Sequence, residues 1–130
     1  MREILFKAKR EDNNEWIEGY YWTNLMNNHF IRIAKDKNEK FTIEDYEIIP
    51  ETLCQYTGIT DQYGNRIWDN DIVYINSLDE KYIILWNKRE LEYVLMNNGY
   101  QVSLGRHFYG KELKVIGNTF DNPKLLEVEE

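Results

Sequence analysis

The chain has 130 residues, of which 42% are hydrophobic and 15% aromatic, and its formal net charge is −7. This length suits one domain or two small subdomains, and the many large rings exclude a disordered chain. No apolar run approaches the ~18–20 residues that cross a bilayer, so we expect no membrane segment.

The residue types favour β-sheet. Branched and aromatic side chains, which fit a pleated surface, are frequent, whereas alanine, the strongest helix former, occurs only at Ala8 and Ala34. Apolar and polar residues alternate with the two-residue period of a strand. We therefore expect a mainly β protein with one or two short helical turns.

The first 49 residues are expected to form a small meander of short strands separated by polar turns. The expected strands cover residues 4–8, 16–22, 29–35 and 41–49. Pro50 interrupts this rhythm, because it fixes φ and lacks an N–H donor, and residues 50–53 fit a helical turn. We place the boundary there, between an N-terminal meander subdomain (1–49) and a C-terminal subdomain (50–130).

The C-terminal subdomain is again strand-like, with hairpin turns at Gly64 and Gly99. The expected strands cover residues 56–59, 66–68, 72–75, 81–86, 90–96, 100–104 and 113–117. Residues 81–86 are apolar on both faces and predict a central strand, whereas 90–96 also match helical spacing. Asn122 and Pro123 predict the cap of a last helical turn over 124–126.

One predicted strand carries an aromatic face. Trp16, Tyr20 and Trp22 share a face of the strand, and Ile17 and Tyr21 lie opposite. Rings that stay exposed would suit a subunit or partner interface, where Tyr and Trp are enriched. The alternative is that these rings fill the core.

No catalytic, cofactor or metal-binding motif is recognisable, so we predict no catalytic residue, no cofactor and no metal. His29 and His107 form no zinc-ligand spacing with Cys54 or with each other, and we expect both to be exposed or hydrogen-bonded. Nothing local activates Cys54 toward His107, so we expect a buried, inert thiol. Ser77 and Ser103 lie outside any GxSxG setting.

The segment 61–72 invites comparison with a calcium loop, which needs ligands at positions 1, 3 and 5, Gly at 6 and Glu at 12. Here Tyr63 stands at position 3, Gly64 at position 4 and Ile72 at position 12. The comparison fails on spacing, and the acids are better explained as turn-formers.

Nucleic-acid binding is not expected from the charge, because an acidic chain of pI about 4.9 lacks the basic surface that binds phosphates of any sequence. The basic clusters are short and interleaved with acids. They comprise Lys7, Lys9 and Arg10, then Lys88 and Arg89, then Arg106, His107 and Lys111 with Tyr109. We interpret them as ordinary loop charges and predict no tight, sequence-independent binding.

Residues 2–8, 53–73 and 115–126, the second with the pattern QYTG…D..G..I...DIV, resemble the YopX family of bacteriophage and prophage proteins. The resemblance implies a mainly β fold, an SH3-like small barrel in the C-terminal part, and self-association. It implies no established activity, cofactor or catalytic residue. Two departures stand out: Asn70 replaces a usual Gly, which implies a less strained turn, and Cys54 often corresponds to Gly.

The central pattern has a structural interpretation. Gly58 and Gly64 permit positive φ, and Asp61 and Asn65 close turn hydrogen bonds. Its apolar members are expected in the core, namely Ile67, Ile72 and Val73. The pattern therefore predicts the fold and not a chemistry.

The sequence thus predicts a cytoplasmic phage or prophage protein that binds its own copies, or a phage or host protein partner, without catalysis. The single cysteine and the absence of a signal peptide at the start favour a reducing compartment. The alternatives are a nucleic-acid-associated small β-barrel and an enzyme with an unrecognised carboxylate site.

Overall fold

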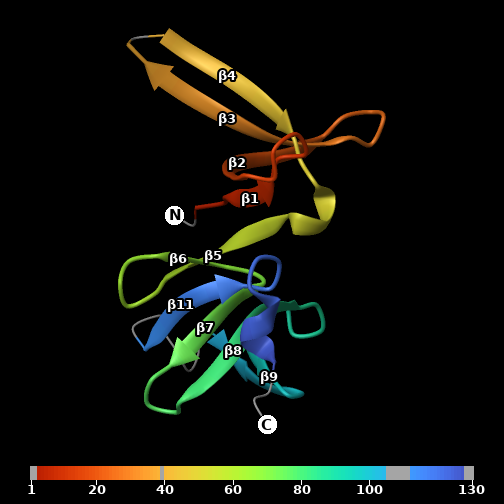
Figure 1. Cartoon of the computed structure of the whole chain (residues 1–130). Coiled ribbons are helices and arrows are strands. Elements are labelled where there is room, and N and C mark those ends of the chain that lie inside the picture. Colours follow the sequence, from red (N-terminus) through yellow and green to blue (C-terminus); the bar gives the residue numbers. More distant parts are fainter. Residues whose placement is uncertain (1–2, 39, 105–111, 128–130) are drawn as a thin grey trace. The chain divides into compact units, whose positions relative to one another are not determined.

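The computed structural model describes residues 3–38, 40–104 and 112–127 (Figure 1). Within these ranges the named elements are β-strands and two short 3-10 turns, which confirms the prediction of a mainly β protein. No helix in the described residues is long and apolar enough to cross a membrane.

The strands follow one another in chain order. They are β1 Phe6–Lys9, β2 Trp16–Thr23, β3 His29–Lys37, β4 Lys40–Glu47, β5 Cys54–Thr60, β6 Arg66–Trp68, β7 Asp71–Ile75, β8 Glu80–Asn87, β9 Glu92–Asn97, β10 Tyr100–Ser103 and β11 Leu113–Asn118. The 3-10 turns are η1 Pro50–Thr52 and η2 Pro123–Leu126. The predicted strands all correspond to these elements, and the strand expected over residues 41–49 is β4, which ends at Glu47.

The strands form two antiparallel sheets. One has the order β4-β3-β2-β1-β5-β6 and the other β10-β9-β8-β7-β11, so β8 is central, as its apolar sequence predicts. The described residues show no pairing that closes either sheet into a barrel.

The chain divides into two compact units, Met1–Tyr56 and Thr57–Glu130. The division falls within β5, whereas the sequence places the boundary at Pro50. Each unit has its own core. The first core is built on Ala8, Ile31 and Ile48, and the second on Ile67, Val73, Ile75, Tyr82, Ile84, Leu95, Leu104 and Leu113.

Asparagines in the left-handed conformation make several of the predicted turns. Asn14, Asn27, Asn38 and Asn98 have φ between 49° and 61°, a region that asparagine tolerates better than most residues. Asn70 belongs to the same group, with φ of 68°. The expectation of a less strained turn at Asn70 is therefore wrong, because its backbone adopts the conformation that favours glycine.

The last helical turn forms where the sequence predicts it, but its cap differs. Asn122 makes no side-chain hydrogen bond to η2. Its Oδ1 instead accepts from the amide of Asn118, the last residue of β11, at 3.2 Å. Asn122 therefore ties η2 back to the sheet and does not cap the turn.

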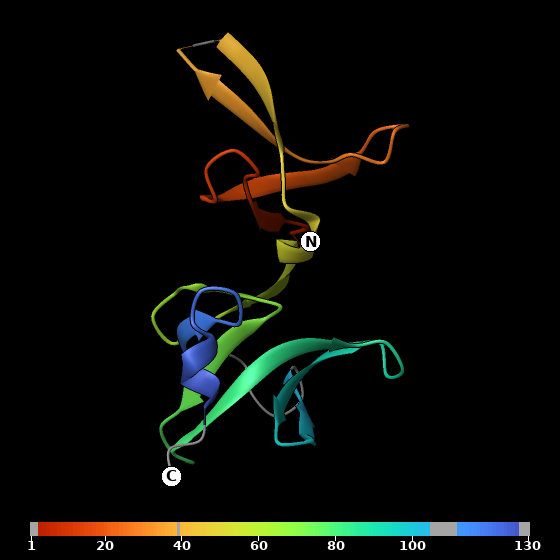
Figure 2. The same cartoon turned by 45° about the vertical axis from the view of Figure 1, so that its right-hand side comes forward.

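Strand β2 pairs with two neighbours over its two halves. Its first half pairs with β1 up to Gly19, and its second half pairs with β3 from Tyr20 onward. A Cβ atom on Gly19 would lie 2.3 Å from the carbonyl oxygen of Arg32, a contact that real side chains do not make. The absence of a side chain at Gly19 therefore lets β3 approach, and in both views the β3–β4 hairpin projects beyond β1 and β2 (Figures 1 and 2).

Gly64 provides a test of the turn chemistry. Its φ of +83° confirms the predicted conformation, and the space around it is open, so only backbone strain opposes a side chain. Gly64→Val should lower the free energy of unfolding by about 1–2 kcal/mol, since a β-branched residue is strained there. Gly64→Asn is the matched control and should cost less, because asparagine tolerates this region. Urea denaturation measures both, and equal stability of the two variants would contradict the argument.

Candidate functional site

Alternation along the strands gives the sheet of the first unit a core face and an opposite face, which we call the outer face. The core face carries Phe6, Ala8, Ile17, Tyr21, Ile31, Ile33 and Ile48. The strand registers place on the outer face Lys7, Lys9, Trp16, Glu18, Tyr20, Trp22, Phe30, Arg32, Ala34, Phe41, Ile43 and Asp45. The predicted sharing of one face by Trp16, Tyr20 and Trp22 is thereby confirmed.

Aromatic rings and cations alternate on the outer face. Trp22 stacks on Phe30 with 4.7 Å between ring centroids, and the Arg32 guanidinium lies 5.0 Å from the centroid of Trp22. At the other end of β2, the ammonium groups of Lys7 and Lys9 lie 4.7 and 5.4 Å from the centroid of Trp16. These are cation–π distances, so the rings hold the cations against the sheet.

Asp45 joins three strands of this face. Its carboxylate accepts two hydrogen bonds from Arg32, at 2.9 and 3.1 Å, and one from Trp22 Nε1 at 3.0 Å. The hydrogen bond from Arg32 is the main cause that lowers the pKa of Asp45, and its counterpart raises the pKa of Arg32. The guanidinium is therefore fixed between a ring and a carboxylate on neighbouring strands.

Several apolar side chains of the outer face are exposed to solvent. Tyr20 is 60% exposed, Phe41 67% and Ile43 52%, whereas Trp16 and Trp22 are half-buried. Sequence reasoning left open whether the rings fill the core, and the structure assigns them to the face away from it. An exposed set of large apolar side chains on one sheet face is typical of an interaction surface.

The residues weighed as catalytic or metal ligands are not assembled into a site in the described residues. His29 Nδ1 lies 2.6 Å from the Tyr21 hydroxyl, as a hydrogen-bonded histidine should. Cys54 is 1% exposed and its thiol contacts the Thr52 carbonyl oxygen at 3.3 Å. His107 lies outside the described residues. Among those described, no three His, Cys, Asp or Glu side chains gather where a metal ion would fit.

The basic clusters are dispersed. The Arg10 guanidinium binds Asp12 and lies 4.2 Å from the Tyr46 ring, away from the outer face. Lys88 and Arg89 lie in the turn after β8. The remaining predicted cluster, residues 106–111, lies outside the described residues.

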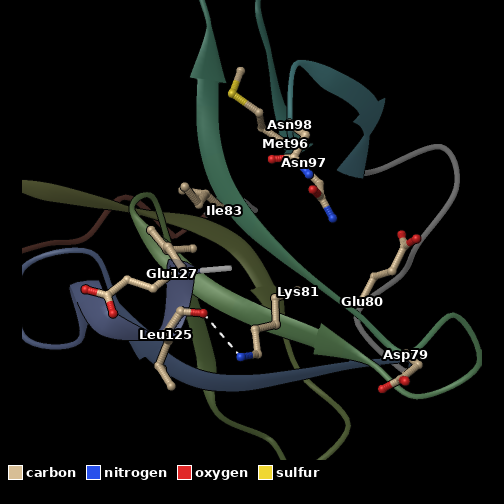
Figure 3. A pocket seen from close by; sticks show the side chains of 10 residues that line it. Asp79, Glu80, Lys81, Ile83, Met96, Asn97, Asn98, Leu125 and Glu127 are labelled. Atoms are coloured by element: carbon tan, nitrogen blue, oxygen red, sulfur yellow. Dashed lines mark hydrogen bonds between the residues drawn. The ribbon is translucent and has the colours of Figure 1, made fainter. Parts of the chain in front are cut away.

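A pocket of about 480 Å³ lies in the second unit (Figure 3). Its lining combines three carboxylates, one ammonium and an apolar floor: Asp79, Glu80, Lys81, Ile83, Met96, Asn97, Asn98, Leu125, Leu126 and Glu127. Lys81 Nζ donates to the Leu125 carbonyl oxygen at 3.2 Å, so the ammonium ties η2 to β8. Asp79 accepts from the Tyr74 hydroxyl and Glu80 from the Tyr82 hydroxyl. These hydrogen bonds engage Asp79, Glu80 and Lys81, three of the charged side chains that line the pocket.

The central sequence pattern has the structural role that was predicted for it. Asp61 is 5% exposed, and its carboxylate accepts from the amides of Tyr63 and Asn65, both at 2.9 Å, and of Val115 at 3.0 Å. Burial by itself would raise the pKa of Asp61, but these hydrogen bonds outweigh it and lower the pKa below the ordinary value of an aspartate. The carboxylate thus fixes the β5–β6 turn and fastens it to β11.

Sequence reasoning missed the contacts of Lys7 and Lys9 with Trp16 and the network around Asp45. The contacts with Trp16 could have been predicted from the register of the β1–β2 hairpin, because Lys9 lies directly opposite Trp16. The network around Asp45 could be predicted only from the combined pairing of β2, β3 and β4. No local sequence signal supplies that pairing.

Comparisons with known proteins agree with this fold. The family model described as YopX protein matches residues 5–127, so the chain belongs to the YopX family. The chain is similar in structure to protein EF1440 from Enterococcus faecalis, with a TM-score of 0.62 and 18% identity, over 98% of this chain and 100% of that chain. At this identity the likeness shows the fold alone. Comparison with curated proteins gives no match.

The Asp61 carboxylate generates a prediction about stability. Its folded-state pKa is lowered, so its contribution is present above the unfolded-state pKa and is lost as the pH falls through the folded-state value. Asp61→Ala should lower the free energy of unfolding at pH 7 by about 2–3 kcal/mol, because it leaves buried backbone amides without an acceptor. Urea denaturation from pH 7 to pH 3 should also show a weaker acid destabilisation in Asp61→Asn than in the unaltered chain. Identical pH profiles would contradict the assignment.

Proposed function

We propose that this member of the YopX family is a phage or prophage protein that acts by binding proteins, including its own copies, and not by catalysis. The observation that carries the proposal is the outer face, where Tyr20, Phe41 and Ile43 are exposed beside half-buried tryptophans. Burying such side chains in a complex releases free energy in proportion to the apolar area removed from water. Tyr and Trp are also the residues most enriched in protein interfaces.

The charges of the outer face favour a protein partner over a polyanion. Arg32 is already engaged by Asp45, and Glu18 lies opposite Lys7 across β1 and β2. A mixed set of charges around exposed rings suits a protein surface with its own mixed charges. A phage or host protein is the second kind of partner that this face would accept.

A nucleic-acid-associated protein is the second candidate, and one observation favours it. Lys7 and Lys9 lie against Trp16, and single-stranded nucleic acids bind to rings flanked by cations. The net charge of −7 and the pairing of Arg32 with Asp45 weigh against it. We therefore keep the protein-binding function first.

Three further features belong to the same proposal. The five-stranded antiparallel sheet of the second unit supports kinship with SH3-type small barrels. The buried thiol of Cys54, the single cysteine of the sequence, suits a reducing cytoplasm. An enzyme with a carboxylate site is the third candidate, but Asp79 and Glu80 at the pocket are held by tyrosine hydroxyls, as structural carboxylates are.

Self-association is the first testable consequence. Light scattering behind a sizing column should give a mass above 15.8 kDa at micromolar concentration. Raising the salt concentration to ~0.5 M should leave the chain oligomeric, because burial of apolar surface is not screened as exposed charges are. A monomer at high protein concentration would overturn the proposal.

The second consequence concerns nucleic acids. In anisotropy titrations with single- and double-stranded oligonucleotides at ~150 mM salt, we expect no binding tighter than about 1 μM, because a chain with a net charge of −7 and only short basic clusters neutralises few phosphates. Lys7→Ala together with Lys9→Ala is the informative variant if binding is seen. Tight binding that falls steeply with salt and disappears in this variant would move the nucleic-acid function to first place.

A further inference from the structure

We propose that two copies of the chain associate by antiparallel pairing of their β4 strands, with Phe41 of one copy opposite Ile43 of the other. The proposal rests on the self-association proposed above and names the surface that produces it. Strand β4 is the last strand in its sheet, and among the described residues no strand pairs with its outer side between Lys40 and Tyr46. An edge of this kind is a template for another strand.

The backbone of β4 presents hydrogen-bonding groups at this edge. In an antiparallel pair, alternate residues bond to the partner strand and the residues between them face away. The amide of Ile48 bonds to His29 at 3.1 Å, and the carbonyl of Glu47 turns away from β3 to accept from Glu11. Every second residue before Glu47 has the same backbone orientation. Ile43 and Phe41 therefore also direct their backbone groups to the open edge.

Symmetry limits the registers that two such edges can adopt. A two-fold axis perpendicular to the sheet keeps each face on its own side, so paired residues must come from the same face of β4. The register centred on Thr42 satisfies this condition. It pairs Thr42 with its own copy, Phe41 with Ile43, and Lys40 with Glu44.

The side chains favour this register over its neighbours. Phe41 opposite Ile43 is an aromatic–aliphatic pair, and Lys40 opposite Glu44 is an ion pair, and symmetry repeats each of them. Centring the pairing on Ile43 would instead place Phe41 opposite Asp45, the carboxylate that holds Arg32. Glu44 Oε2 already lies 3.7 Å from Lys35 Nζ. A carboxylate has two acceptor oxygens, so in this register Glu44 could also pair with Lys40 of the other copy.

The exposure of the hairpin fits the same arrangement. Phe41 and Ile43 are 67% and 52% exposed, and the strand register places both on the outer face. The β3–β4 hairpin that carries them projects beyond β1 and β2 (Figures 1 and 2). Pairing two β4 strands would join two hairpins into one four-stranded ribbon. It would also bring Phe41 and Ile43 of both copies into a single apolar cluster.

Proline at position 43 tests the backbone pairing. Ile43→Pro removes only an N–H that faces the open edge, and proline is accepted in edge strands. We expect it to raise the dissociation constant of the dimer by about ten-fold or more, whereas Ile43→Ala, which keeps the N–H, should have a smaller effect. Far-UV circular dichroism checks that each variant folds.

A second pair of variants remains informative if the proline variant does not fold. Phe41→Lys places a charge at the edge, and Leu25→Lys makes the same change at a fully exposed residue of the β2–β3 turn. Both raise the net charge equally. Only Phe41→Lys should weaken the dimer in sedimentation equilibrium.

The register is tested by charge exchange and by cross-linking. Lys40→Glu and Glu44→Lys should each weaken the dimer, and the double variant should recover part of the loss, because the opposed charges are again unlike. Thr42→Cys should form a disulfide between copies under mild oxidation, since the two Cα atoms of this non-hydrogen-bonded pair would lie about 4.5 Å apart. Thr23→Cys, at the exposed end of β2, is the control and should not cross-link.

The outcomes separate this inference from the proposed function. A monomeric unaltered chain would overturn both. An oligomer that survives Ile43→Pro and Phe41→Lys, and that Thr42→Cys does not cross-link, would leave self-association standing and overturn the β4 edge. Loss of the dimer in Leu25→Lys to the same extent as in Phe41→Lys would also overturn it.

Discussion

The close approach of β3 to Gly19 is the constraint on which the first unit depends. At Gly19, β2 passes from pairing with β1 to pairing with β3, and a side chain there would collide with the backbone of Arg32. The approach fixes which residues of β3 lie opposite Tyr20 and Trp22. It therefore determines that aromatic rings and cations gather on one face, while the small side chain of Ala8 and the branched chain of Ile31 are buried on the other.

Asp45 in the first unit and Asp61 in the second unit have different structural roles. Asp45 lies near the surface and binds Arg32 and Trp22, so it orders the outer face of the first unit. Asp61 is buried and accepts backbone amides from a turn and from β11, so it is committed to the fold. The difference comes from the donors: side chains of neighbouring strands donate to Asp45, whereas backbone amides donate to Asp61, and both sets of donors stabilise the charged carboxylate.

The exposed apolar residues of β4 lie at an open sheet edge, so the two features together affect how this strand can associate. Natural sheets protect their edges with charges, prolines or short strands, because an open edge invites association. In β4, Lys40 and Glu44 lie on one face, and Phe41 and Ile43 lie on the other. This arrangement admits a second strand only where unlike charges meet and apolar side chains face each other. It suits the proposed pairing with one specific strand better than unspecific aggregation.

The sequence by itself determined the β class, the strand positions, the turns at asparagine and glycine, and the family. These depend on neighbouring residues: alternation defines a strand, and the backbone freedom of Asn14 or Gly64 defines a turn. It also determined that Trp16, Tyr20 and Trp22 share a face, because that follows from the period of two. Only the tertiary structure decided that this face is the outer one, that Asp45 holds Arg32, and that β4 lies at an edge. Those facts depend on which strands pair and on which side the core forms, and pairing joins residues far apart in the chain, for which no local pattern carries a signal.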